Sequence, residues 1–252
     1  MTDAPTSKNQ AKKLLKRQRI EQRYQRMKQE RREKAVRPVE SSEPQSSEKP
    51  QNQRQERNAM FKADYDSKCQ SGPVIVIDCD WADKMTEREL LSLTQQIMYA
   101  YAANRRAEKP ARICLLGVSD AHATLIRKLP GFATWSIPLS NMRIPQTNTH
   151  TVYLTADTEN ILTEQQMGNI NTLVIGGIVD RNRHKNATLL KAEELNIPVA
   201  QLPIGEYMPL KSSKVLTVNH VVEILLEFLH HKDWKLALDT VIPDRKKDII
   251  FS

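Results

Sequence analysis

Glycine-rich phosphate loops are missing from this chain. Its 252 residues include only seven glycines, and neither GxGxxG nor GxxxxGK followed by Ser or Thr occurs in the sequence. Because such loops hold the phosphates of dinucleotides and nucleoside triphosphates, their absence argues against ordinary NAD binding and P-loop hydrolysis. Four of the seven glycines fall between positions 168 and 205. This concentration indicates where a ligand approaches the backbone.

Cysteines and long apolar runs are also scarce. Cys69, Cys79 and Cys114 show no CxxC spacing, which favours reduced thiols and argues against a zinc site, so we expect no metal. No apolar run approaches the ~18 residues of a membrane span, and none follows the amino terminus as in a secretory signal. We therefore expect a soluble protein of the nucleus or cytoplasm. Acidic residues in the amino-terminal segment make a mitochondrial transit peptide the weaker expectation.

The positive charge of the chain is confined to its amino-terminal segment. Residues 1–57 hold 16 Lys and Arg against 8 Asp and Glu, whereas residues 58–252 hold 22 of each, so the net charge of +8 lies in the tail. Strong helix formers without Gly or Pro occupy residues 8–35, and a linker rich in Pro, Ser and Gln follows over 36–57. The tail suits either a solvated, disordered arm or an arm that binds a polyanion by releasing its counterions. We predict a basic tail and linker over 1–57, helical or disordered, and a folded domain over 58–252.

Short apolar runs alternate with helical stretches from Pro73 onward. This alternation predicts an α/β fold with a mainly parallel sheet. The predicted strands cover 74–78, 112–117, 151–155, 173–179 and 197–201, and the predicted helices cover 85–103, 121–129, 158–166, 186–195 and 215–231.

The segment from Leu173 to Tyr207 has the features of a ligand site. Its first apolar residues suit a strand covered on both faces, and Gly176 and Gly177 let a ligand approach the backbone. Asp180 follows at the carboxyl end of that strand, where open α/β sheets bind their ligands.

Six blocks in the carboxyl-terminal part of the chain resemble a known family. They are VIDCDWADKM (76–85), SLTQQIMYAYAANRRA (92–107), VYLTADTENIL (152–162), VIGGIVDRNRHK (174–185), LPIGEYM (202–208) and KVLTVNHVVEILLEF (214–228). Together they resemble the SPOUT-superfamily methyltransferases that modify N1 of the purine at position 9 of tRNA. The blocks span roughly residues 72–247 and leave out the tail and linker, although family members have a similar basic extension.

The resemblance implies both a fold and a cofactor. It implies a Rossmann-like sheet whose carboxyl-terminal part is threaded into a trefoil knot, with S-adenosylmethionine bound by the loops of the knot through backbone groups. This would account for the missing phosphate loops. For the leucines in the implied pocket, plain core packing is the alternative role. The pocket carried over by motif comprises Leu154, Thr155, Gly176, Gly177, Leu202, Pro203, Ile204, Leu216 and Thr217.

The implied activity is methyl transfer to N1 of guanine, which needs no metal. N1 carries a proton at neutral pH, and a positioned carboxylate could remove it. Asp180 is the candidate base; alternatively it only binds the substrate or caps the next turn while water takes the proton. Asp78 ends the first predicted strand on the same edge and could touch or steer the target base. Gln96 and Asn182 could pair with the edge of that base, although Gln96 could equally be a helix-surface residue without a role, and the same alternative holds for Asn182.

Several basic side chains near these blocks are candidate contacts to tRNA. Such contacts would supply free energy to expose the base at position 9 before the reaction. The resemblance also implies a monomer, in a superfamily whose other members mostly dimerise. The alternatives are methylation of adenine or of both purines, or a tRNA-binding scaffold for tRNA processing. The candidate RNA contacts are Arg105, Arg106, Arg143, Arg181, Arg183 and Lys185.

Overall fold

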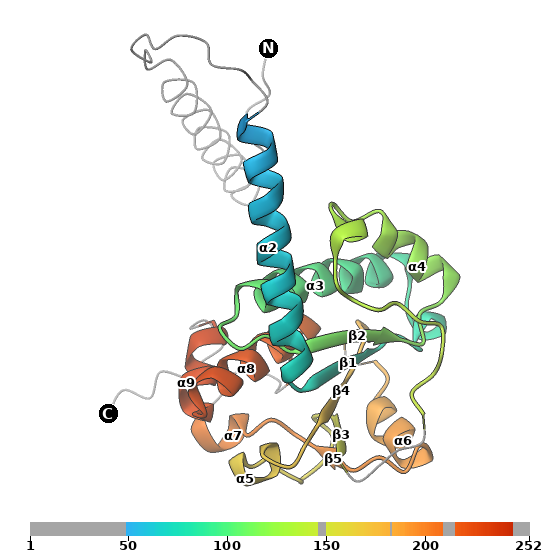
Figure 1. Cartoon of the computed structure of the whole chain (residues 1–252). Coiled ribbons are helices and arrows are strands. Elements are labelled where there is room, and N and C mark those ends of the chain that lie inside the picture. The colour runs from blue at the N-terminus through green and yellow to red at the C-terminus, as the bar shows by residue number, and fades with distance from the viewer. Residues whose placement is uncertain (1–48, 146–149, 182, 209–214, 244–252) are drawn as a thin grey trace, which may run out of the picture. The chain divides into compact units, whose positions relative to one another are not determined.

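The computed structural model describes residues 49–145, 150–181, 183–208 and 215–243 (Figure 1). The chain divides into two units between Gln53 and Arg54, and the second unit, Arg54–Ser252, contains the whole sheet. The predicted helix over 8–35 lies outside the described residues. No helix in the described ranges has the length and apolar character needed to cross a membrane.

Five parallel strands form one sheet in the order β2-β1-β4-β3-β5. The strands are β1 (Val74–Asp78), β2 (Arg112–Leu116), β3 (Thr151–Leu154), β4 (Thr172–Gly176) and β5 (Val199–Ala200). Four of the five lie within the segments predicted from the apolar runs, and β4 begins one residue before its predicted segment, so the α/β fold with a parallel sheet is confirmed. The residues Ile178 and Val179, predicted to continue the fourth strand, lie beyond its end at Gly176.

Helices connect and cover the strands (Figure 1). The longer ones are α2 (Lys49–Ser71), α3 (Glu87–Arg106), α4 (Asp120–Arg127), α6 (Ala187–Glu194), α8 (Val218–His231) and α9 (Trp234–Val241). Short helical turns are η1 (Ala82–Lys84), η2 (Phe132–Thr134), α5 (Glu164–Met167) and α7 (Ile204–Tyr207).

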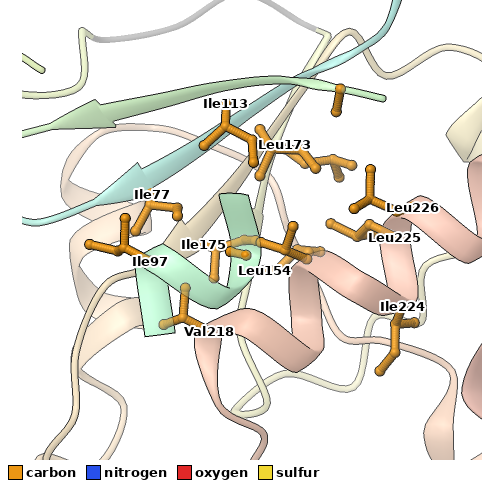
Figure 2. Close-up of a cluster of buried hydrophobic side chains, with 14 of the residues drawn as sticks. Ile77, Ile97, Ile113, Leu154, Leu173, Ile175, Val218, Ile224, Leu225 and Leu226 are labelled. Atoms are coloured by element: carbon orange, nitrogen blue, oxygen red, sulfur yellow. The ribbon is translucent and has the colours of Figure 1, made fainter. Parts of the chain in front are cut away.

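The two faces of the sheet bury different side chains, because successive residues of a strand point to opposite faces. Ile75 and Ile77 of β1 belong to the larger core cluster, together with residues of α3 and α8. Val76, between them, packs in a smaller cluster with Ala192 of α6. In Figure 2, Ile77 and Ile175 of the sheet lie in one cluster with Val218, Leu225 and Leu226 of α8. The sheet is therefore buried on both faces, as the continuous apolar runs of its strands require.

The helix α3 illustrates how the sequence specifies these elements. Thr86 and Glu89 form a reciprocal capping box at its start. Its buried residues recur every three or four positions, as in Leu90, Leu93 and Ile97, which places them on the side facing the sheet. At its far end, the Asn104 side chain hydrogen-bonds Ala111 just before β2 and Tyr65 of α2, with 2.8 Å between the paired atoms.

Two predicted segments differ from the structure. The helix predicted over 158–166 is wrong for most of its length, because only the four-residue α5 forms. Before it, the backbone N–H of Leu162 donates to the carbonyl of Gln201, which holds this stretch beside the end of β5. The helix α2 begins at Lys49, within the segment predicted as a linker.

The domain boundary after residue 57 stays a prediction. The trefoil knot also stays a prediction, because the path between Met208 and Val215 lies outside the described residues.

Candidate functional site

A cavity lies beyond the carboxyl ends of β3, β4 and β5 and reaches the first turn of α8. Six of the nine residues predicted for the cofactor pocket line this cavity. This arrangement places the candidate ligand site at the edge where open α/β sheets bind their ligands. The six residues are Leu154, Thr155, Gly176, Leu202, Ile204 and Leu216.

The other three predicted pocket residues, Gly177, Pro203 and Thr217, do not line the cavity within the described ranges. A Cβ at Gly177 would come within 2.6 Å of the Asp78 carbonyl oxygen, which accepts the N–H of Gly177 at 2.7 Å. Close packing against β1 is therefore sufficient to require a glycine at position 177, and a contact of Gly177 with a cofactor stays a prediction. Pro203 precedes α7, and Thr217 precedes α8 with its hydroxyl donating to Asn219.

Polar residues that the prediction missed complete the cavity wall. Asp157, His184, Thr188 and Gln201 all line it. The Thr188 hydroxyl donates to the hydroxyl of Thr155 at 2.8 Å and so joins α6 to the end of β3. Asp157 and His184 lie inside the blocks TADTEN and GGIVDRNRHK, so their position after a predicted strand end was the available signal.

Asp180 lies in the wall of the cavity and is buried, with 9% of its surface exposed. Its Oδ2 atom accepts the backbone N–H of His184 at 2.8 Å. The predicted alternative, in which Asp180 caps the next turn, is thus realised in the structure. Asp180 also lines the cavity, and a carboxylate has acceptor sites beyond the one that the His184 N–H uses, so capping and proton transfer are compatible roles.

Asp78 does not line the cavity within the described ranges, so its contact with the target base stays a prediction. It is fully buried, and its carboxylate accepts the Tyr153 hydroxyl at 2.7 Å and pairs with Lys191 at 2.7 Å. Burial, followed by the neighbouring carboxylate, holds the pKa of Tyr153 well above its ordinary value, so the phenol remains a neutral donor. The ammonium of Lys191 lies 4.5 Å from the centre of the Trp81 ring. Asp78 thus anchors α6 to the sheet.

Gln96 also has a structural position. Its Oε1 atom accepts the backbone N–H of Val218 at 2.9 Å, and its amide group donates to Ser92 at 3.3 Å. The residue preceding α8, Thr217, makes no side-chain cap of its own. Gln96 therefore caps α8 from the neighbouring helix, and its predicted contact with a nucleobase edge is not supported. Asn182 lies outside the described residues.

The candidate RNA contacts fall into two groups, one near the amino ends of the strands and one near their carboxyl ends. Arg105 and Arg106 end α3, which runs back from the carboxyl end of β1 toward the amino end of β2. The guanidinium of Arg105 stacks there, 5.2 Å from the ring centre of Phe61. The other group is on the edge that holds the cavity and comprises Arg143, Arg181, Arg183 and Lys185.

Within the second group, the cations differ in how they are engaged. Arg143 is 80% exposed and pairs with Asp80 at 3.1 Å. Arg183 is half-exposed, with a 2.7 Å ion pair to Glu89. Arg181 and Lys185 are exposed. Among the described residues, no group of three or more His, Cys, Asp and Glu side chains could hold a metal ion.

Comparison with known proteins identifies what this arrangement resembles. Residues 4–247 match the model of the family described as tRNA (guanine(9)-N(1))-methyltransferase TRM10/TRM10A. A tRNA (guanine(9)-N1)-methyltransferase of Kluyveromyces lactis is 37% identical over 195 residues, which cover 73% of this chain and 62% of the relative. The chain thus spans less than two thirds of that relative's length.

Two solved structures share the fold. The full-length spTrm10 structure in complex with SAH is 32% identical, covers 68% of this chain and 97% of its own, and has a TM-score of 0.59. The structure called spTrm10(74) is 33% identical with a TM-score of 0.61, over 68% of this chain and 94% of its own. The predicted SPOUT-type α/β fold is confirmed by these likenesses.

Proposed function

The chain belongs to the tRNA (guanine(9)-N(1))-methyltransferase TRM10/TRM10A family, and from this membership we propose that it methylates N1 of guanine at position 9 of tRNA with S-adenosylmethionine. The observation that carries the proposal is the cavity at the carboxyl edge of the sheet, with Asp180 in its wall. The complex of spTrm10 with SAH, the demethylated form of this cofactor, supports the choice of methyl donor.

The side chains around the cavity fit S-adenosylmethionine. Apolar residues such as Leu154, Ile175 and Leu202 suit the flat adenine ring, and the carboxylates of Asp157 and Asp180 suit hydroxyl groups and positive charge. No Lys or Arg occurs among the lining residues in the described part of the chain. Such a wall favours a cationic ligand without phosphates over a nucleotide. When bound, the cofactor supplies an electrophilic methyl group on a sulfonium.

In this proposal, Asp180 is the general base that removes the proton from N1 of guanine. The N1 atom of guanine carries a proton at neutral pH, so methylation at N1 requires that proton to leave. The Asp180 carboxylate accepts it, and the N–H of His184 orients the carboxylate by binding Oδ2. The walls of the cavity hold the reacting groups together, and this positioning supplies much of the rate enhancement.

The exposed cations Arg143, Arg181 and Lys185 are proposed phosphate contacts, because they lie on the edge that carries Asp180. Arg105 and Arg106 lie at the opposite edge, so they would contact a separate part of the tRNA. We also propose that the chain acts as a monomer and that its basic tail binds the RNA backbone.

The basic tail can be tested by deleting residues 1–48, which leaves all of α2 in place. We expect at least tenfold weaker tRNA binding at moderate salt and a shallower dependence of affinity on salt, because fewer phosphates are neutralised. Gel shifts over a range of salt concentrations measure both quantities. Equal affinity of the shortened and full chains would contradict a role of the tail in binding.

The proposed activity is tested with the full chain, S-adenosylmethionine and two tRNA transcripts that carry G or A at position 9. Mass spectrometry of the digested nucleosides identifies the product. 1-Methylguanosine from the G9 transcript alone is the expected result. 1-Methyladenosine would shift the assignment to adenine or to both purines, and tight binding without methylation of either transcript would favour the scaffold.

A further inference from the structure

The Arg183 side chain joins two loops that are far apart in the sequence. Its Nε atom donates to the carbonyl oxygen of Asp180 at 2.9 Å, and its own backbone N–H donates to the same oxygen at 3.2 Å. Its Nη2 atom contacts the carboxylate of Glu89 at 2.7 Å and the carbonyl of Lys84 at 3.4 Å. One guanidinium thus connects the Asp180 turn to the start of α3.

A further contact between the same two segments lies close by. The backbone N–H of Val179 donates to the sulfur of Met85 at 3.3 Å. Val179, just before Asp180, and Arg183, three positions after it, are therefore both attached to the segment that precedes and begins α3. This attachment restricts how far the Asp180 turn can move relative to the sheet.

The turn needs such support because its backbone is strained. Arg181 has a φ of 53°, in the left-handed region that non-glycine residues rarely adopt. A strained residue of this kind persists only where surrounding contacts hold it in place. The contacts of Arg183 lie two positions further along and supply that restraint.

We propose that Arg183 is a positioning residue for Asp180, held in place by Glu89, and not a contact to RNA phosphate. The inference rests on the proposed methylation of tRNA. It assigns to Glu89 a role in the same device, since the Glu89 carboxylate is 15% exposed and binds the guanidinium directly. The contacts to a carboxylate and two carbonyl groups engage three of the five N–H donors of the guanidinium and fix its orientation toward α3.

The chain provides a way to remove the ion pair without unfolding α3. Glu89 also accepts the backbone N–H of Thr86 at 2.9 Å in the capping box. Glutamine serves in that position equally well, as Gln166 does with Thr163 at the start of α5. The variant Glu89→Gln therefore keeps the cap and removes only the charge that holds Arg183.

The test compares Arg183→Gln, Arg183→Lys, Glu89→Gln and the double variant Glu89→Gln/Arg183→Gln in the full chain. The controls are Arg88→Gln and Glu87→Gln, which remove the same charges from exposed neighbours on α3. Single-turnover rates at saturating tRNA and S-adenosylmethionine, tRNA dissociation constants and their salt dependence are measured. Hydrogen exchange of the amides of Val179 and His184 gives a readout independent of catalysis.

We expect Arg183→Gln and Glu89→Gln each to lower the single-turnover rate roughly tenfold to a hundredfold, because small displacements of catalytic groups have effects of this size. The double variant should be no slower than the slower single variant, since both remove one interaction. Affinity for tRNA should stay within about twofold of the Arg88→Gln control, with an unchanged salt slope. Arg183→Lys should remain slow, because an ammonium cannot reproduce the fork of the guanidinium.

The opposite pattern would overturn the inference. A phosphate contact predicts weaker tRNA binding and a smaller salt slope for Arg183→Gln, a normal rate at saturation, and recovery by Arg183→Lys. If the wild-type chain methylates no tRNA, the proposed function fails. Hydrogen exchange alone then tests the clamp, which is the set of contacts by which Arg183 and Glu89 hold the Asp180 turn. Faster exchange at Val179 and His184 in both Arg183→Gln and Glu89→Gln would support the clamp, and unchanged exchange would refute it.

Discussion

Asp78 is the last residue of β1, and Asp180 follows the end of the adjacent parallel strand β4. The two carboxylates nevertheless have different surroundings. Asp78 is fully buried and surrounded by donors, with Tyr153, Lys191 and the N–H of Asp80 all bonded to its carboxylate. Asp180 lines a cavity, and the N–H of His184 binds one of its oxygens. A carboxylate at a strand end is therefore only a candidate for chemistry, and its partners decide its role.

The difference follows from where each residue leaves the sheet. Asp78 is the last residue of β1, paired in register with Gly176 of β4. It shares the parity of Val76, so its side chain points to the face that α6 covers. Asp180 comes four residues after the end of β4, in a turn that is no longer bound by the alternation of a strand. That turn can direct a carboxylate into the cavity.

The largest effect is expected from Asp180→Asn, which should lower methylation of a G9 tRNA by roughly a hundredfold to ten-thousandfold. Asparagine keeps an oxygen that can accept the His184 N–H, so the turn should remain folded while the base is lost. Single-turnover kinetics measure the rate, and calorimetric titration checks that S-adenosylmethionine still binds. An unchanged rate would show that water or another group takes the proton.

Asp78→Asn should act on stability instead. Removing one partner of a buried ion pair leaves Lys191, 14% exposed, with Asp80 at 3.3 Å as its remaining acidic partner, and this should cost up to about 3 kcal/mol of unfolding free energy. Urea unfolding at pH 7 measures the loss. The double variant Asp78→Asn/Lys191→Met should recover much of it. A slower reaction without loss of stability would instead indicate contact with substrate and break the contrast with Asp180.

His122 extends the contrast to a buried polar side chain that has no partner. It is fully buried in α4, and neither ring nitrogen has a hydrogen-bond partner in the described part of the chain. Burial lowers its pKa from 6.5 to about 4. Because the unfolded chain then takes up a proton below about pH 6.5 and the folded chain does not, stability is complete above that pH and falls as the pH drops toward 4.

This pH dependence can be measured by comparing His122→Leu with the parent chain. The loss of unfolding free energy between pH 7 and pH 5 should be smaller in the variant by about 2 kcal/mol. The matched control is His230→Gln, at an exposed histidine near the end of α8, which should keep the parental pH dependence. Identical pH profiles for the parent and His122→Leu would show that His122 does not stay neutral in the fold.

The smallest effect is expected from Gln96→Ala. Loss of its hydrogen bond to Val218 should lower the unfolding free energy by about 1 kcal/mol, as for other lost helix caps. Gln96→Glu keeps an acceptor oxygen at the same place and should recover most of the loss in urea unfolding. If Gln96→Ala left stability unchanged but altered the preference for G9 over A9, this result would support the predicted contact of Gln96 with the base.

Much of the fold could be predicted because a strand covered on both faces is a continuous apolar run, as in Val74–Ile77. The helix over 158–166 was predicted wrongly because its residues are compatible with a helix, while the hydrogen bond from Leu162 to Gln201 holds the backbone beside β5. In the site, Gly176 lines the cavity, whereas Gly177 packs against the backbone of Asp78. The two glycines are adjacent in the sequence, and only their neighbours in space distinguish them.

The family, the α/β class and the segment that supplies Asp180 could all be recognised in the sequence alone. Local apolar patterns and short motifs are sufficient for these, because each is written in a few consecutive residues. The contacts by which Asp78 holds α6, Gln96 caps α8 and Arg183 binds the Asp180 turn became visible only in the folded chain. These roles depend on partners 113, 122 and 94 positions away, and a polar side chain takes its role from whichever group the fold brings within hydrogen-bond distance.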